Sequence, residues 1–317
     1  MESTKDVTKL KLALVTGGWS DEREIALSSA HACEKALREA GFEDIDFIDV
    51  AEKGFAARLE SGGYDVAFVA MHGRWGEDGC IQGLLECLHI PYTFSDVLAS
   101  ARAGEKEVAK QAYAAAGVQI ARGCELKGAD IADAELHSRL VDELGLPLFV
   151  KPANNGSSYG ITRVAEASQM EAAIALAAEG DSPVLVEECV QGMDVTAPVL
   201  GNDDAQPLPV IEIVTGAEFY DLKVKYEPSE LHHVIPARLD GEVYARVQEA
   251  AVAAHRALGC RGASRSDFIV RDDGTPVILE TNTIPGMTET SLLPDAARHA
   301  GISFPELCRR LVELALE

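Results

Sequence analysis

The sequence lacks any long apolar run, and this absence excludes a membrane-spanning protein. No stretch approaches the roughly 20 consecutive apolar residues that a helix needs to cross a bilayer. The first eleven residues are polar and charged, without the apolar centre of a secretory signal. We therefore expect a cytoplasmic protein that does not insert into membranes.

Basic residues are scarce relative to acidic ones. The chain has 28 Lys plus Arg against 52 Asp plus Glu, a formal charge of -24. Such a surface repels nucleic-acid backbones and anionic membranes. An anionic small molecule could bind only where lysines or a metal ion are placed locally, so we expect small-molecule partners.

Cysteine pairs are also missing. The seven cysteines are odd in number and scattered, at positions 33, 80, 87, 124, 189, 260 and 308. This spacing indicates neither a disulfide framework nor a zinc site, and it favours inert thiols in a reducing compartment. The chain contains no internal repeat and no low-complexity tract.

The first third of the chain predicts an open parallel α/β domain over residues 1–96. Apolar strands at 12–15, 45–50 and 65–70 alternate with helical segments. We expect Ser20 to be the N-cap of the first helix, which carries acidic residues in its first turn and stops near Gly41. The length, 317 residues with 47% apolar composition, allows two further domains.

A small central domain is predicted over residues 97–189. It should contain one helix from Asp96 to about Gly117, strands at 147–152 and 183–187, and a helix that the capping box 168–171 opens. The remainder, 190–317, predicts an antiparallel-sheet domain. Its polar segment 218–236 is typical of a lid or binding loop, and we interpret His232 and His233 as loop residues.

The segment 265–282 predicts a β-hairpin, because Asp273-Gly274 lies between alternating apolar residues. With these two as the loop, one register pairs Asp272 with Thr275, Ile269 with Ile278, Asp267 with Glu280 and Arg265 with Asn282. Opposed carboxylates repel. A divalent cation such as Mg²⁺ removes the conflict, and Asn282 offers a third oxygen. The alternative is a solvated acidic face.

The loop 154–160, Asn-Asn-Gly-Ser-Ser-Tyr-Gly, follows the strand that ends near Lys151. Successive N–H groups in such a loop can bind a phosphate, although a plain hairpin turn fits the residues equally. Lys106 and Lys151 would contribute to phosphate binding only if the fold brings both to the same phosphates. Otherwise each is a surface lysine.

Two further segments carry candidate chemistry. The turn at Pro285-Gly286 follows Asn282, and the Gly286 N–H beside Arg265 would form an oxyanion hole; the alternative is a simple strand-to-helix turn. His72 lies at the carboxyl end of an apolar strand, where ligands of open α/β sheets bind. It could contact a substrate carboxylate, or it could be a capping or solvated histidine.

Together these residues resemble the D-alanine–D-alanine ligases of the ATP-grasp superfamily over nearly the whole chain. The markers are Gly17-Gly18-Trp19-Ser20-Asp21-Glu22-Arg23-Glu24, His72-Gly73-Arg74 with 76–79, Lys151-Pro152 with 156–158, Lys225-Tyr226, Arg265-x-Asp267, and Glu280-x-Asn282 with 285–288. The resemblance implies an ATP-grasp fold, mixed α/β and α+β, with the three domains predicted above. It also implies a homodimer.

The resemblance further implies a role for each site residue. Two Mg²⁺ ions, with Mn²⁺ as a substitute, would be held by Asp267, Glu280 and Asn282. ATP would be contacted by Lys106, Lys151, Ser158, Lys225, Glu187, Glu188, Val190, Asp194 and Leu279. D-alanine and the closed lid would be held by Glu22, His72, Ser157, Tyr226, Arg265, Gly286, Ser291 and Leu292.

The implied reaction joins two D-alanines for peptidoglycan precursors. A D-alanine carboxylate attacks the γ-phosphate of ATP, and the amine of a second D-alanine displaces the phosphate from the acyl phosphate. Five positions depart from the usual pattern, namely Ala26, Gly104, Glu105, Tyr159 and Asp194. Ala26 and Tyr159 leave open a same-fold ligase for another amino acid pair. A catalytically silent nucleotide-binding protein is the rival from another class.

Overall fold

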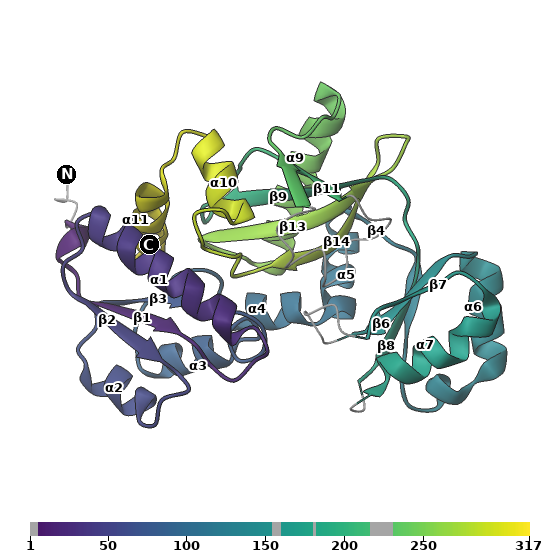
Figure 1. Cartoon of the computed structure of the whole chain (residues 1–317), viewed down its shortest axis with the longest axis horizontal. Helices are drawn as coiled ribbons and strands as arrows, with labels where there is room; N and C mark the ends of the chain where they lie inside the picture. The colour runs from purple at the N-terminus through teal and green to yellow at the C-terminus, as the bar shows by residue number, and fades with distance from the viewer. Residues whose placement is uncertain (1–5, 154–159, 180–181, 216–230) are drawn as a thin grey trace.

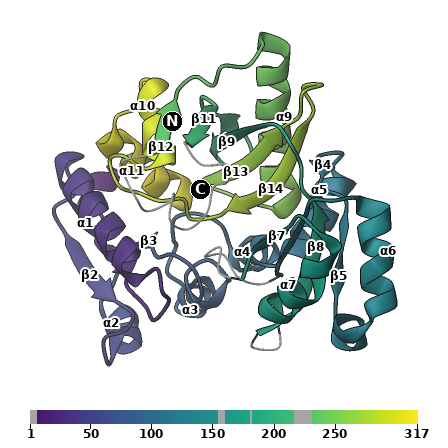
Figure 2. The same ribbon diagram turned by 45° about the vertical axis from the view of Figure 1, so that its right-hand side comes forward.

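The computed structural model describes residues 6–153, 160–179, 182–215 and 231–317. Figures 1 and 2 show the N-terminal and central sheets at opposite ends of the molecule, with the C-terminal sheet between them. The architecture combines the predicted parallel N-terminal sheet and largely antiparallel C-terminal sheet with a central sheet that is also antiparallel.

The N-terminal sheet is parallel, as predicted, with strand order β2-β1-β3. Its strands are β1 (Leu12–Thr16), β2 (Ile45–Asp49) and β3 (Val66–Ala70), and its helices are α1 (Arg23–Glu39), α2 (Phe55–Ser61) and α3 (Cys80–Cys87), after the short turn η1 (Val7–Lys9). Strands β1 and β3 are buried along their whole length, which suits a sheet covered on both faces.

The start of α1 differs from the prediction. Glu22 is the N-cap residue, and its side chain makes no capping bond. Ser20 does not cap the helix, because its hydroxyl donates to the backbone oxygen of His72 at 2.9 Å. This bond joins the loop after β1 to the loop after β3.

The central sheet has the order β5-β8-β6-β7. Its elements are β5 (Gly123–Leu126), β6 (Leu148–Pro152), β7 (Thr162–Val164) and β8 (Val184–Glu188), with η2 (Gly128–Ala132), η3 (Ala167–Gln169), α6 (Ala134–Leu144) and α7 (Met170–Ala177). The predicted capping box at 168–171 is wrong, since Glu166 and Gln169 form it at η3.

The C-terminal sheet has the order β12-β11-β9-β13-β14-β4, and β10 pairs with β9. Its strands are β4 (Gln119–Ile120), β9 (Met193–Leu200), β10 (Gln206–Pro207), β11 (Ile211–Thr215), β12 (Leu231–Val234), β13 (Ala263–Val270) and β14 (Pro276–Asn282). The accompanying helices are α9 (Gly241–Leu258), α10 (Leu292–His299) and α11 (Phe304–Ala315). The loop interpretation of His232 and His233 is wrong, because both belong to β12.

The helix predicted from Asp96 to Gly117 is two helices. Asp96 caps α4 (Val97–Gly104), and Glu105, with an extended backbone, separates it from α5 (Lys106–Ala115). Lys106 therefore begins a helix instead of lying inside one. Strand β4, which follows α5, pairs with β14, and α5 packs against α9, so this segment is attached to the C-terminal sheet.

Two predictions of absence can be compared with the structure. All seven cysteines are among the described residues, and each is unpaired. In the described ranges, no helix combines the length and the apolar character needed to cross a membrane.

Candidate active site

Charged side chains of two neighbouring strands meet on one face of the C-terminal sheet. Asp267 of β13 lies opposite Glu280 of β14, and Arg265 lies opposite Asn282, as predicted. The Asn282 amide nitrogen lies 3.4 Å from an Asp267 carboxylate oxygen. Two acids and an amide therefore occupy adjacent positions, where opposed Cβ atoms are typically about 4.5–5.5 Å apart.

The tip of the hairpin differs from the prediction. The Arg271 N–H donates to the Thr275 oxygen at 3.0 Å, which leaves residues 272–274 as a three-residue loop. Gly274 has φ +77°, the left-handed conformation expected at the end of such a loop. The predicted pairing of Asp272 with Thr275 is therefore wrong.

A β-bulge corrects the resulting offset of one residue. The register shifts between Asp267 and Phe268, and Phe268 pairs with Ile278. Leu279 is the extra residue of β14, so the predicted pairing of Ile269 with Ile278 is also wrong. The bulge restores the predicted register at the carboxylates.

Asp267 is the most densely contacted acid of this face. The Arg265 guanidinium donates to both of its carboxylate oxygens at 3.0 Å, and the Thr196 hydroxyl donates to one of them. Asp194, two residues before Thr196 on β9, is the nearby third acid. Burial, and next the charge of Asp267, raise the pKa of Asp194 to about 7, whereas Arg265 lowers it. The face concentrates negative charge that a cation would relieve.

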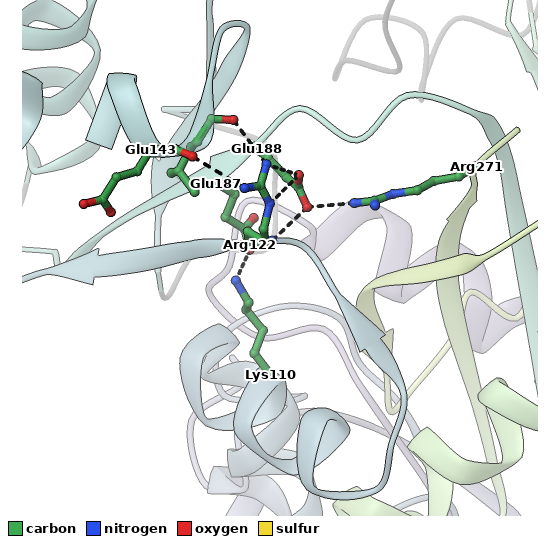
Figure 3. Close-up of polar contacts among 7 residues, drawn as sticks. Lys110, Arg122, Glu143, Glu187, Glu188 and Arg271 are labelled. Carbon is green, nitrogen blue, oxygen red and sulfur yellow. Dashed lines mark hydrogen bonds and ion pairs between the residues drawn. The ribbon is translucent and has the colours of Figure 1, made fainter. Parts of the chain in front are cut away.

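A buried carboxylate organises the lysines opposite this face. Glu187 of β8 accepts from Lys151 of β6 and from Lys110 of α5, each at 2.5 Å (Figure 3 draws the bond from Lys110). Burial alone would raise the pKa of Glu187, but the two lysines outweigh it and hold that pKa below its ordinary value. Glu187 therefore carries a charge at neutral pH.

Lys106 is coupled electrostatically to both groups. Burial lowers the pKa of its ammonium, the charge of Glu280 opposes this, and the charge of Lys151 lowers the pKa further. The charges of Glu280, on the acidic face, and of Lys151 therefore both act on Lys106.

The remaining predicted nucleotide residues lie around the same strands. Glu188 pairs with Arg122 and Arg271. Val190 is partly buried in the connection from β8 to β9, and Leu279 is the partly buried bulge residue.

The N-terminal domain contributes a buried histidine. His72 Nε2 lies 3.0 Å from the Ser29 hydroxyl, and that hydroxyl accepts from the Met287 N–H at 3.4 Å. Glu22 lies close to Gly73, because a Cβ added there would be 3.6 Å from the Glu22 carboxylate carbon. His72 is therefore neither solvated nor a cap, and its partner Ser29 connects it to the turn after β14.

The turn after β14 is packed tightly. A Cβ on Gly286 would lie 3.0 Å from the Ser291 hydroxyl. That hydroxyl accepts from the Thr288 N–H at 3.0 Å. Leu292 begins α10 directly after Ser291 and is partly buried. Gly286, Ser291 and Leu292 thus form one local unit beside Asn282.

Four predicted site residues lie outside the described residues: Ser157, Ser158, Lys225 and Tyr226. Most of the predicted phosphate loop, 154–160, and of the predicted lid loop, 218–236, also lies outside the described residues.

Comparison with known proteins agrees with this geometry. A family model for the D-Ala–D-Ala ligase C-terminus matches residues 113–313, and one for the N-terminus matches residues 47–95. The D-alanine–D-alanine ligase of Desulforamulus reducens is 45% identical over 97% of this chain and 99% of its own. That of Desulforudis audaxviator is 46% identical over 97% and 99%. The chain belongs to the D-alanine–D-alanine ligase family.

Solved structures of this ligase family have the same fold. The enzyme of Bacillus anthracis, in complex with ATP, superposes with a TM-score of 0.82 at 31% identity and covers 97% of both chains. The VanG D-Ala:D-Ser ligase of Enterococcus faecalis gives a TM-score of 0.83 at 31% identity, over 97% of this chain and 99% of that one. The predicted ATP-grasp architecture is confirmed.

The donor set on the acidic face fits the hard divalent cation typical of the ligase family. Asp267, Glu280 and Asn282 supply oxygens only, the ligand type that Mg²⁺ prefers. Within the described ranges there is no group of three or more His, Cys, Asp and Glu suited to a metal. The side-chain oxygen of Asn282, which neighbours both acids, is available as a third donor.

Sequence reasoning missed three residues that position the site. Lys110, Thr196 and Ser29 hold Glu187, Asp267 and His72 respectively. A signal existed for Lys110, which follows Lys106 by four residues and so shares its helix face. The other two are neutral hydroxyls that only the tertiary structure singles out.

Proposed function

We propose that this protein is an ATP-dependent ligase that joins two D-alanines to D-alanyl-D-alanine, with release of ADP and phosphate, for peptidoglycan precursors. One observation carries the proposal: Glu280, which faces Asp267 across the hairpin, interacts electrostatically with Lys106, and Lys106 interacts in the same way with Lys151. A triphosphate with divalent cations would neutralise both charge groups at once.

The nucleotide would bind between the central and C-terminal sheets. Asp267, Glu280 and Asn282 would hold two Mg²⁺ ions, with Mn²⁺ as a substitute. The phosphates would be contacted by Lys106, Lys151, Ser158 and Lys225, and the adenosine by Glu187, Val190, Asp194 and Leu279. When bound, the cations would neutralise negative charge on the phosphates.

The two D-alanines would bind where the N-terminal domain meets the turn after β14. Glu22 would bind the ammonium of the first, and His72, held by Ser29, would lie near its carboxylate. Arg265 and the Gly286 N–H would stabilise the oxyanion that forms when the second amine attacks. Ser291 and Leu292 would shape the second subsite, and Ser157 and Tyr226 would close the lid with Glu22.

Positioning and charge neutralisation are the main tasks of these residues. The first carboxylate attacks the γ-phosphate and ADP leaves, so an acyl phosphate forms. The second amine then attacks the acyl carbon and phosphate departs. Water has to be excluded between the two steps, because it would hydrolyse the acyl phosphate.

The organisation of the protein follows from this function. We assign residues 1–96 to the substrate domain, 97–189 to the central ATP-grasp unit, whose α5 and β4 pack on the C-terminal sheet, and 190–317 to the unit with the lid and metal residues. Peptidoglycan precursor synthesis uses soluble small molecules, which supports a cytoplasmic location. A homodimer remains our proposal for the assembly.

A substrate panel tests the function. ADP release should be measured with D-alanine, D-serine, D-lactate and L-alanine, singly and in pairs, with Mg²⁺ present. We expect D-alanine alone to give the fastest turnover. Preference for a mixed pair containing D-serine would instead favour the activity named for the VanG relative, and nucleotide binding without turnover would favour a silent binding protein.

A further inference from the structure

The chain crosses twice between the central and C-terminal sheets, and the two crossings lie close together. The first, residues 121–122, connects β4 to β5, and the second, 189–192, connects β8 to β9. Gly192 has φ +153°, and a Cβ there would lie 2.1 Å from the Val270 oxygen. The second crossing therefore lies directly against the end of β13.

Glu188, the last residue of β8, pairs with one arginine from the first crossing and with another from the end of β13. It accepts from the Arg122 N–H at 3.0 Å and from the Arg122 guanidinium at 3.0 and 2.9 Å. It also accepts from Arg271, which directly follows β13, at 2.7 Å. Figure 3 shows both guanidinium groups converging on this one carboxylate.

The carboxylate of Glu188 is well suited to hold these bonds. Its side chain is only 13% exposed. Burial alone would raise its pKa, but the backbone and side-chain hydrogen bonds of Arg122 and the charge of Arg271 lower the pKa below its ordinary value. Glu188 is therefore charged at neutral pH, with both oxygens already occupied by protein donors.

Arg122 extends the connection into the central domain. Its guanidinium donates to the backbone oxygens of Glu143 and Leu144, at the C-terminal end of α6, at 3.5 and 3.3 Å. A cation at this end of a helix is favourable. One carboxylate thus links α6, both crossings and the end of β13.

Glu187, the residue before Glu188, also pairs with a basic side chain, but on the opposite face of β8. Successive side chains of a strand point to opposite faces. Glu187 accepts a hydrogen bond from Lys110 of α5, and this helix packs against α9 of the C-terminal domain. Each of these two acids therefore contacts a cation attached to the C-terminal sheet.

We propose that Glu188, with Arg122 and Arg271, is a latch that fixes the spacing of the central and C-terminal sheets around the nucleotide, and that Glu188 is a positioning residue instead of a nucleotide ligand. This rests on the proposed function, because it assumes that the nucleotide binds between the two sheets. It revises the role that the family resemblance implies for Glu188.

The expected effect follows from population arithmetic. A nucleotide that binds only at one spacing of the sheets has an apparent Kd equal to the intrinsic value divided by the populated fraction of that spacing. Loss of the latch lowers this fraction. It does not change the contacts within the bound complex, so turnover at saturating ATP should change little.

Four variants test the latch: Arg271→Gln, Arg271→Lys, Glu188→Gln and the double variant Arg271→Gln/Glu188→Gln. Titration calorimetry would give the Kd of ADP with Mg²⁺, and steady-state kinetics would give kcat and KM for ATP. Both single Gln variants should raise Kd and KM about three- to tenfold, as a fall of the competent fraction by that factor predicts. The double variant should be no worse than either, and Arg271→Lys should recover part of the loss.

Arg309→Gln is the matched control. Arg309 pairs with Glu306 and Glu313 within α11, so its loss breaks two ion pairs that are remote from both crossings. It should leave Kd and KM unchanged. Unfolding midpoints of all variants identify a merely structural role, which would lower the midpoint without changing Kd.

Three results would overturn the latch. An effect of Glu188→Gln without one of Arg271→Gln would make Glu188 a nucleotide ligand. Unchanged Kd and KM in both would mean that the bridge has no bearing on the nucleotide. Failure of the unmodified protein to bind ADP with Mg²⁺ would overturn the proposed function itself, and the latch with it.

Discussion

Asp267 and Glu280 face each other across β13 and β14 although both are acids. Directly opposed like charges destabilise a sheet by up to about 1 kcal/mol. The Arg265 guanidinium binds Asp267 and offsets part of the repulsion. The remaining repulsion lowers the stability of the fold, and a bound cation would relieve it.

Substitution of one acid should therefore separate stability from activity. Glu280→Gln removes the repulsion, so the metal-free protein should keep or slightly raise its unfolding midpoint. Turnover should fall at least about 100-fold, the scale seen when one electrostatic stabiliser of a transition state is lost. ADP release and thermal unfolding check this. A near wild-type rate would contradict the metal assignment.

Lys110→Met tests the buried pair beneath the nucleotide lysines. Removal of one partner of a buried ion pair typically costs about 3–5 kcal/mol, and the cost here should lie at or below the lower end, because Lys151 still binds Glu187. KM for ATP should also rise. Denaturant unfolding measures the first effect. Lys35→Met, which breaks an exposed pair with Glu289, is the control and should leave stability nearly unchanged, because solvent screens exposed ion pairs.

Gly286→Ala tests the tight turn beside Asn282. The added methyl would lie 3.0 Å from the Ser291 hydroxyl, closer than an ordinary contact, so the Ser291 side chain or the turn that carries the Gly286 N–H has to move. Because displacements near 1 Å can cost about 100-fold in rate, we expect kcat to fall about tenfold or more. Ser291→Ala in the same chain makes room and should recover part of the loss. Unaltered kcat in Gly286→Ala would count against an oxyanion role for this turn.

The burial of His255 should make the protein less stable in mild acid. It is fully buried beside Ser264, and burial lowers its pKa from 6.5 to about 4. Between these values the unfolded chain binds a proton that the folded chain excludes, so stability is complete above pH 6.5 and falls as the pH decreases toward 4. At pH 5 the loss should be about 2 kcal/mol.

Comparison with a variant isolates this contribution. His255→Gln cannot titrate, so the difference in unfolding free energy between pH 7.5 and pH 5 should be about 2 kcal/mol smaller than in the unmodified protein. Equal pH dependence of the two proteins would mean that His255 is protonated in the folded state.

Local patterns predicted the parts of the molecule that local forces determine. The fully apolar runs that became β1 and β3 required a covered sheet. The pairing of Asp267 with Glu280 followed from alternation along the hairpin. The helix break at Glu105 and the strand position of His232 were missed, since sheet pairing and packing with distant segments override local preference.

Long-range partners account for most of the site that the sequence did not reveal. Glu188 meets Arg122 and Arg271, which lie 66 and 83 residues away. No spacing rule relates such positions, and the family resemblance assigned Glu188 to the nucleotide instead. A residue's type indicates what it can bind, whereas the fold decides which partner it meets.

The extra residue, Leu279, reverses the side-chain alternation of β14 at the bulge. On the inner side of the bulge Glu280 and Asn282 point toward the ligand face, and on the outer side Ile278 turns to the opposite face to join Phe268 in the core. A strictly alternating strand would have put an isoleucine beside the carboxylates. The bulge therefore keeps Ile278 in the core and away from Asp267 and Glu280, while the outer part of the hairpin remains a regular antiparallel pair.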